Sequence, residues 1–168
     1  MAGKKLFIMR HGKSDWQAKF KRDYDRPLAE RGVDAASQMG KHLTAIGQVP
    51  EFILSSSAKR ALNTIEIAVA EGAWQAKLET NRQLYLASVE EAVELIKTTH
   101  DSIKKLMIVA HEPMCSSLIA ELCMGAHVKF PTAAVARINL NIESWAEVGG
   151  NDGRLDWLLT PKSLTKQI

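Results

Sequence analysis

Short apolar runs alternate along the chain with segments of helical periodicity. Three of the runs end in polar residues and have the form of strands buried on both faces of a sheet, at 5–10, 51–55 and 105–111. Elsewhere apolar residues recur every three or four positions, which predicts helices that pack by one face. These helical segments lie at 36–46, 62–69, 89–96 and 113–122.

The alternation of strands and helices is typical of an α/β domain, with a mostly parallel sheet and helices on both faces. Two further strand-like segments, 134–141 and 154–160, are joined by a glycine-containing loop, which predicts a hairpin at one edge of the sheet. No Pro/Gly/Ser-rich linker, internal repeat or low-complexity tract divides the chain. We therefore expect residues 1–168 to form a single domain, since roughly 100–200 residues is typical of one.

Basic side chains are concentrated at the start of the chain. Residues 1–31 hold nine basic and four acidic side chains, a net +5, whereas residues 32–168 hold thirteen and fifteen, a net −2. The formal net charge of the whole chain is only +3, so we expect no nucleic acid and no membrane surface as partners. The local excess of positive charge instead favours an anionic substrate.

Apolar runs and cysteines indicate the compartment. The longest apolar run, 106–110, is far shorter than the ~20 residues of a spanning helix or the roughly 7–15 of a signal-peptide core. Cys115 and Cys123 lie eight positions apart on a predicted helix, about 12 Å of rise, which is too far for a disulfide. We therefore expect a cytoplasmic protein with reduced cysteines.

Polar side chains follow each of the three buried strands. Arg10 and His11 end the first strand, Ser56 and then Arg60 follow the second, and His111 ends the third. Because ligands bind at the carboxyl ends of parallel strands, we expect these side chains to meet at one edge of the sheet. Two histidines and two arginines beside helix N-termini form an anion site suited to phosphate.

The chemistry of each residue type suggests its role in phosphoryl transfer. A neutral imidazole at His11 has a ring nitrogen that can attack phosphorus, provided that the other nitrogen is held as a donor. Arg10 and Arg60 would stabilise the charge on the phosphoryl oxygens and would disfavour protonation of His11. His111 could donate a hydrogen bond to the same oxygens, and the helix after Ser56 would add its amides.

These motifs resemble the histidine phosphatase superfamily, which includes phosphoglycerate mutases and acid phosphatases. The residues that carry the resemblance are Arg10-His11-Gly12, the pattern Ser55, Ser56, Arg60, Ala61 and Thr64, and His111 with Pro113. RHGKSDW at 10–16, DRPLAERG at 25–32 and the short length are most similar to the SixA-type phosphohistidine phosphatases. The resemblance implies a phosphoglycerate mutase-like fold, transient phosphorylation of His11, and no metal or other cofactor.

Two absences refine what the resemblance implies. Larger members of the superfamily carry a long insertion that roofs the site, but only 50 residues separate Arg60 from His111, so we expect no lid. Many members that cleave phosphate esters have a glutamate after the third strand of the family's fold. The matching stretch of this chain, 82–86, precedes the predicted strand at 105–111 and contains no acid. An alkoxide needs a proton to leave, while the imidazole of phosphohistidine is a much weaker base. Both absences favour phosphohistidine carried on a protein.

Further side chains near the first strand are candidates for contact with substrate. Arg26 could extend the phosphate pocket, and an ordinary loop arginine is the alternative interpretation. Lys13 and Ser14 follow the catalytic turn closely enough to meet substrate, or else belong to a solvated loop. The basic stretch 19–22 could steer a phosphorylated partner, although such stretches are commonly only solvated.

The sequence therefore predicts a phosphatase that removes phosphate from protein phosphohistidine through a covalent phospho-His11 intermediate. The expected partner is a phosphohistidine-carrying protein, such as a member of a phosphorelay. A small-molecule phosphomonoesterase of the same superfamily is one alternative, which a preference for phosphate esters would reveal. A phosphate-recognition module without turnover is the other, although neither His11 nor an arginine of the site has been lost.

Overall fold

The computed structural model describes residues 3–150 and 152–165. Six strands make up one sheet: β1 (Lys4–Arg10), β2 (Phe52–Ser56), β3 (Lys77–Asn81), β4 (Lys105–Ala110), β5 (Val135–Leu140) and β6 (Gly153–Leu159). The α-helices are α1 (Glu30–Ala45), α2 (Lys59–Gly72), α3 (Val89–Lys97), α4 (Met114–Leu122) and α5 (Pro161–Thr165). Three short 3₁₀ turns are η1 (Asp23–Asp25), η2 (Arg82–Tyr85) and η3 (Trp145–Glu147).

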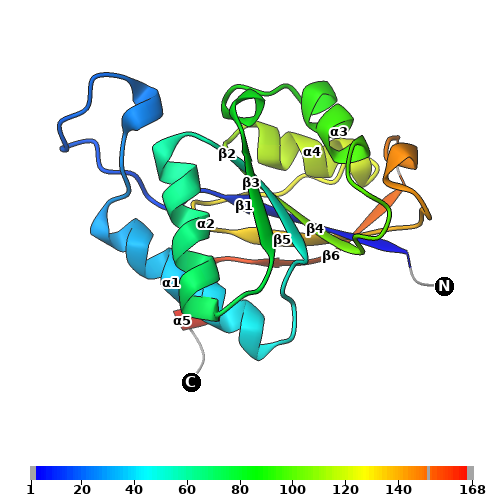
Figure 1. Ribbon diagram of the computed structural model, residues 1–168, viewed down its shortest axis with the longest axis horizontal. Helices are drawn as coiled ribbons and strands as arrows, with labels where there is room; N and C mark the ends of the chain where they lie inside the picture. The colour runs from blue at the N-terminus through cyan, green and yellow to red at the C-terminus, as the bar shows by residue number, and fades with distance from the viewer. Residues whose placement is uncertain (1–2, 151, 166–168) are drawn as a thin grey trace.

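The strands lie in the order β3-β2-β4-β1-β5-β6 (Figure 1). The first four are mutually parallel, whereas β5 pairs antiparallel with β1 and β6 pairs antiparallel with β5. The predicted α/β class, parallel sheet and C-terminal edge hairpin are therefore confirmed. The carboxyl ends of β1, β2 and β4, which are neighbours in the sheet, open onto the same edge.

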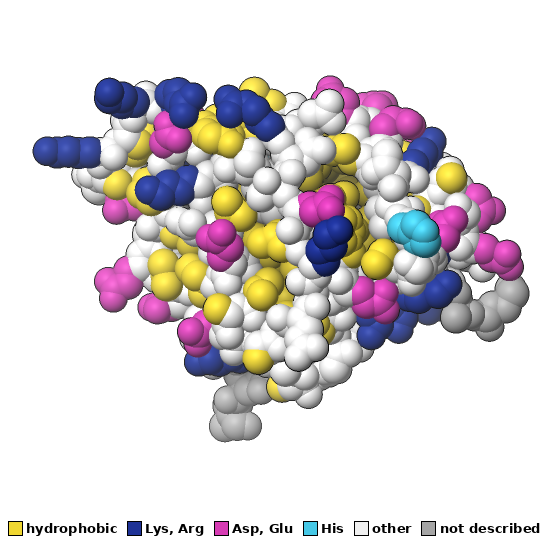
Figure 2. Space-filling view, viewed as in Figure 1, with side chains coloured by type: hydrophobic (Ala, Val, Ile, Leu, Met, Phe, Trp, Pro, Cys, Tyr) yellow, Lys and Arg dark blue, Asp and Glu magenta, His cyan; other side chains and the backbone are white. Residues whose placement is uncertain are grey.

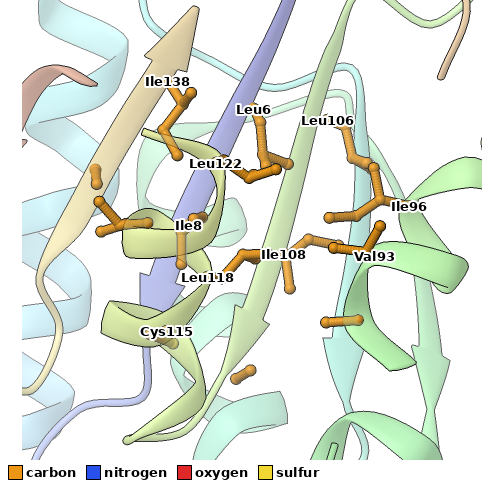
Figure 3. Packing of buried hydrophobic residues seen from close by; sticks show 14 of the residues in the cluster. Leu6, Ile8, Val93, Ile96, Leu106, Ile108, Cys115, Leu118, Leu122 and Ile138 are labelled. Atoms are coloured by element: carbon orange, nitrogen blue, oxygen red, sulfur yellow. The ribbon is translucent and has the colours of Figure 1, made fainter. Parts of the chain in front are cut away.

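Strand alternation divides the core between the two faces of the sheet. Leu6 and Ile8 point toward α3 and α4, where Figure 3 shows them packed with side chains of β4 and both helices. Phe7 and Met9 point to the opposite face, which α1 and α2 cover (Figure 1). Because every residue of β1 from 6 to 9 is fully buried, the strand is held rigidly just before His11.

Close backbone contacts fix the elements that flank this sheet edge. A Cβ added at Gly40 in α1 would lie 2.3 Å from the carbonyl oxygen of Ala68 in α2, so only glycine permits this approach of the two helices. A Cβ added at Gly12 would lie 2.9 Å from the carbonyl oxygen of Gly32, where the turn after β1 meets the start of α1. These contacts set the position of α2, whose first turn carries Arg60.

Two elements were not predicted from the apolar pattern. β3 is an edge strand with mostly exposed side chains, so it has no apolar run. The short helix α5 contains no buried residue and has too few residues to show a period. In the described part of the chain, no helix combines the length and apolar character that crossing a membrane would require.

Candidate active site

The predicted catalytic side chains meet at the carboxyl edge of the sheet. His11 follows β1, His111 follows β4, and Arg60 lies in the first turn of α2, directly after β2. The two imidazole rings lie 5.2 Å apart between centroids. All three side chains are buried, with 6–8% of each residue exposed. The topology therefore brings together residues that are up to 100 positions apart in the sequence.

The ring of His11 is held in one orientation by the backbone. Its Nδ1 lies 2.7 Å from the carbonyl oxygen of Gly12. A carbonyl can only accept, so Nδ1 must carry the hydrogen, and Nε2 keeps its lone pair. The Gly12 amide in turn donates to Oγ1 of Thr64 at 2.9 Å, which ties this turn to α2. His11 thus has the tautomer that a nucleophile at Nε2 requires.

The surroundings of His11 also keep it uncharged. Burial lowers its pKa from 6.5 to about 4, although the hydrogen bond to Gly12 acts in the opposite direction. The nearby guanidinium groups of Arg60, Arg10 and Arg26 contribute to the same lowering of the pKa. The expected effect of neighbouring cations on His11 is therefore present, but desolvation by burial is the larger cause.

His111 is oriented by a side chain from the neighbouring strand. Its Nε2 lies 2.8 Å from Oγ of Ser56, which also accepts a hydrogen bond from the Ala58 amide at 3.2 Å. The hydroxyl of Ser56 can donate to Nε2 in the tautomer of His111 that carries the ring hydrogen on Nδ1. Nδ1 is buried and has no hydrogen-bond partner among the described residues. Burial is the main cause that lowers the pKa of His111 to about 3, and the interactions with His11 and with the Arg60 guanidinium act in the same direction.

Arg10 and Arg60 each retain donors that the protein leaves unused. Arg10 donates from Nη1 to the carbonyl oxygen of Phe130 at 3.1 Å. Arg60 donates from Nη1 to the carbonyl oxygen of Asp23 at 2.8 Å and from Nη2 to its carboxylate at 2.9 Å. The Nε atoms of both arginines are buried without a partner in residues 3–150 and 152–165. Buried donors of this kind are available to the oxygens of a phosphoryl group.

Asp23 is a site residue that the sequence analysis missed. Its carboxylate forms ion pairs with Arg60 and Arg26 and accepts a hydrogen bond from the hydroxyl of Tyr85 at 2.8 Å. Burial acts to raise the pKa of Asp23, but the hydrogen bonds from Tyr85 and Arg60 and the nearby arginine charges outweigh it and lower this pKa. The one sequence signal for Asp23 was its position three residues before Arg26, in the i, i+3 spacing of an ion pair.

The secondary candidates have different positions. Arg26 is 6% exposed and joins the site through Asp23, and its Nε donates to Oγ of the buried Ser14 at 2.9 Å. Its guanidinium also lies 3.7 Å from the ring centre of Trp16. Lys13 is exposed and borders a separate hollow beside α1 and α5. The structure therefore brings Arg26 and Ser14 to the cluster and does not bring Lys13 there.

Acidic residues near the site have other partners. Both carboxylate oxygens of Glu112 accept hydrogen bonds from Ser116, which ties Glu112 to the first turn of α4. Glu79 pairs with Lys77 at 3.1 Å on the edge strand. Within residues 3–150 and 152–165, no three His, Cys, Asp or Glu side chains are grouped as a metal site would need. Asp23 is thus the carboxylate that the cluster holds.

A hollow adjoins His111 on one side of the cluster. Its volume is about 330 Å³, and it lies between η2 and the start of α4, bordered by Tyr85, Leu86, His111 and Pro113 among others. On the other side, Figure 2 shows Lys and Arg side chains gathered at the upper left over the loop between β1 and α1. A group bound at His11 would therefore have an apolar wall on one side and a basic loop on the other.

The fold and this cluster define an α/β protein with a histidine- and arginine-lined anion site. The sequence model of the Histidine phosphatase superfamily (branch 1) matches residues 6–85. An uncharacterized protein of Mycobacterium leprae is 32% identical over 144 residues, which cover 79% of this chain and 87% of the relative. The chain belongs to the histidine phosphatase superfamily.

Two further comparisons concern the SixA type within that superfamily. The phosphohistidine phosphatase SixA of Escherichia coli is 28% identical over 174 residues, which cover 95% of each chain. A solved structure of the protein histidine phosphatase SixA complexed with tungstate is 28% identical and superposes with a TM-score of 0.82, over 95% of this chain and 99% of the other. The chain is therefore similar to SixA along nearly its whole length, and the expected phosphoglycerate mutase-like fold is confirmed.

Proposed function

We propose that this protein hydrolyses phosphohistidine on a partner protein through a phospho-His11 intermediate. The observation that carries the proposal is the tautomer of His11, whose Nδ1 donates to Gly12 and leaves Nε2 free. This nucleophile lies beside His111 and close to the guanidinium groups of Arg60 and Arg10, which lower its pKa. A neutral nucleophile surrounded by unused N–H donors is what attack on a phosphoryl group requires.

In the first step, the lone pair on Nε2 of His11 attacks phosphorus. The substrate ring reacts with its other nitrogen protonated, so that when the bond between phosphorus and its imidazole nitrogen breaks, the electron pair of that bond leaves with a neutral imidazole. Charge on the three equatorial oxygens is stabilised by Arg10, Arg60 and the Nδ1–H of His111. In the second step, water attacks the phosphoryl group on His11, loses a proton and releases inorganic phosphate with neutral His11.

The leaving group decides which substrate we propose. The segment 82–86 places Tyr85, and no carboxylate, beside His111, and Glu112 is bound to α4. The pKa of Asp23 is lowered by its hydrogen bonds from Tyr85 and Arg60 and by the arginine charges, so this carboxylate carries no proton to donate near neutral pH. An imidazole leaves as a weak base, whereas an alkoxide would need a proton from an acid in its path. The name of the E. coli relative, phosphohistidine phosphatase, supports the same choice.

We propose that the partner is a phosphorelay protein and that the enzyme works in the cytoplasm. One relative, which is 27% identical to this chain, is described as chloroplastic.

Rapid quenching tests the covalent step. Mixing the enzyme with a ³²P-labelled phosphohistidine protein should give a phosphoenzyme that is stable in alkali and labile in acid. His11→Ala should abolish this label and lower turnover by at least about a thousandfold, since removing a nucleophile costs several kcal/mol of transition-state stabilisation. His100→Ala is the matched control, because His100 is exposed and its ring forms a hydrogen bond with Ser102. Full turnover by His11→Ala would reject the mechanism.

A further inference from the structure

The carboxylate of Asp23 lies among the donors that a phosphoryl group would use. It pairs with Nη2 of Arg60 at 2.9 Å and with Nη1 of Arg26, and it accepts from the Tyr85 hydroxyl at 2.8 Å. The backbone carbonyl of Asp23 accepts a hydrogen bond from Nη1 of Arg60 at 2.8 Å. Both terminal nitrogens of Arg60 therefore donate one hydrogen bond to the same residue, Asp23.

Asp23 is much more exposed to solvent than the arginines that it binds. It belongs to the short turn η1, which contains no buried residue, and 47% of its side chain is exposed. The side chains of Arg60 and Arg26 are each only 7% exposed. Burying a guanidinium is costly unless an anion pairs with it. Asp23 supplies that anion from the more exposed side of the pairing, in a turn that contains no buried residue.

We propose that Asp23 is an internal competitor of the phosphoryl group. The carboxylate neutralises Arg60 and Arg26 in the free protein, and the incoming phosphoryl oxygens replace it. No covalent bond changes in this exchange: one set of hydrogen bonds to the arginines is broken and another is formed. The inference rests on the proposed function, because it assigns the same cluster as the phosphate site, and it adds the residue that sets how tightly this site binds anions.

The charges involved explain why substrate can displace Asp23. A phosphoryl group carries about −1.5 to −2 charges at pH 7 and three strong acceptor oxygens, whereas a carboxylate carries one charge and two oxygens. Exchange is therefore favourable for a phosphoryl group and unfavourable for singly charged anions at ordinary concentrations. Asp23 thus raises the concentration at which any anion occupies the site.

Inhibition by inorganic anions tests the exchange. The inhibition constants of phosphate and sulfate would be measured during hydrolysis of a small phosphoramidate, for the wild type and Asp23→Asn. Removing the competitor should lower both constants by a common factor of about five to ten, the size expected for losing one charge-assisted contact. The KM of the phosphoramidate should fall by the same factor. Asp23→Ala, which removes both acceptor oxygens, should act in the same direction.

Asp25→Asn is the matched control. Asp25 belongs to the same turn and pairs with the exposed Arg22 at 2.9 Å, so this variant removes an equal charge without touching the cluster. Its inhibition constants should stay within about twofold of the wild type, because exposed charges are strongly screened. Thermal unfolding of each variant checks that its fold is intact.

The possible results separate this inference from the proposed function. Unchanged or weaker anion inhibition in folded Asp23→Asn would overturn the inference, because the carboxylate would then position the arginines instead of competing for them. An equal effect of Asp25→Asn would also overturn it, since general charge would be responsible. Turnover of phosphohistidine by the wild type would leave the proposed function standing in both cases. Absence of turnover and of anion inhibition in the wild type would reject both.

Discussion

The surroundings of His11 and His111 favour the neutral form of both imidazoles. Burial, reinforced by nearby positive charge, lowers their pKa values to about 4 and about 3. Both imidazoles therefore stay neutral at every pH above about 5, and His11 keeps its nucleophilic lone pair there. The unfolded chain protonates its histidines near pH 6.5, so these two groups reduce folding stability progressively as the pH falls from about 6.5 toward 4.

An NMR titration of ¹³C-labelled histidine checks this prediction. The signals of His11 and His111 are assigned as those missing from the spectra of His11→Gln and His111→Gln. Each signal should show its midpoint well below 6.5 in the ligand-free protein. Bound sulfate should raise both midpoints, because an anion beside the rings favours the imidazolium. A midpoint at or above 6.5 for His11 in the free protein would contradict the electrostatic account of the site.

The catalytic residues that the sequence predicted share one feature: each directly follows a buried strand. His11 and His111 end apolar runs, and Arg60 lies in the helix after another, so parallel-sheet geometry alone brings them together. Asp23 follows no strand. It reaches the cluster because the loop between β1 and α1 folds back, with Ser14 bridged to Leu28. Such a loop path depends on tertiary contacts, which the apolar pattern does not record.

At the scale of elements, the pairing of α1 with α2 positions Arg60. Gly40→Ala should destabilise the protein by about 1–3 kcal/mol, because the added Cβ would overlap the carbonyl of Ala68 and force the helices apart. An alanine in an unobstructed helix would instead stabilise by about 0.5–1 kcal/mol. Urea unfolding measures the difference, and kcat/KM should fall as well, since α2 carries Arg60.

The neighbouring Lys41→Ala provides the control for this prediction. Lys41 is exposed in the same helix and forms only a long surface pair with Glu71 at 3.4 Å. Its replacement should change the unfolding free energy by less than about 0.5 kcal/mol. Equal or greater stability of Gly40→Ala would mean that the helices do not approach each other as closely as the structure shows.

Helices and strands that bury an apolar face could be predicted from the sequence, and those that bury none could not. α1, α2, α3 and α4 each bury one apolar face, and their periods were visible in the sequence. β3 is an edge strand whose side chains are mostly exposed. Its pairing with β2 rests on backbone hydrogen bonds, which the pattern of apolar residues in the sequence does not reveal. The hairpin of β5 and β6 was predictable because its apolar residues meet the core.

For the molecule as a whole, chain length and charge distribution limit the substrate. The cluster of histidines and arginines is bordered on one side by a largely apolar hollow. Figure 2 shows Lys and Arg side chains gathered over the loop between β1 and α1. The sequence indicated both the short connection between Arg60 and His111 and the positive charge of the first 31 residues. The partner that fits this surface is determined by the shape and the charge of the folded surface together. The order of residues in the sequence does not show that combination.

The central claim is that the protein acts on phosphohistidine. It is tested most directly by comparing kcat/KM for a phosphohistidine protein with kcat/KM for a panel of sugar phosphates, nucleotides and an aryl phosphate, under identical conditions. We predict a preference of at least about a hundredfold for the phosphohistidine protein over the sugar phosphates and nucleotides, since the site supplies no acid to protonate their leaving oxygen. The aryl phosphate, whose phenolate leaves without a proton, serves as the reference for phosphoryl transfer itself. Higher kcat/KM for a sugar phosphate or a nucleotide would contradict the claim and identify a small-molecule phosphomonoesterase.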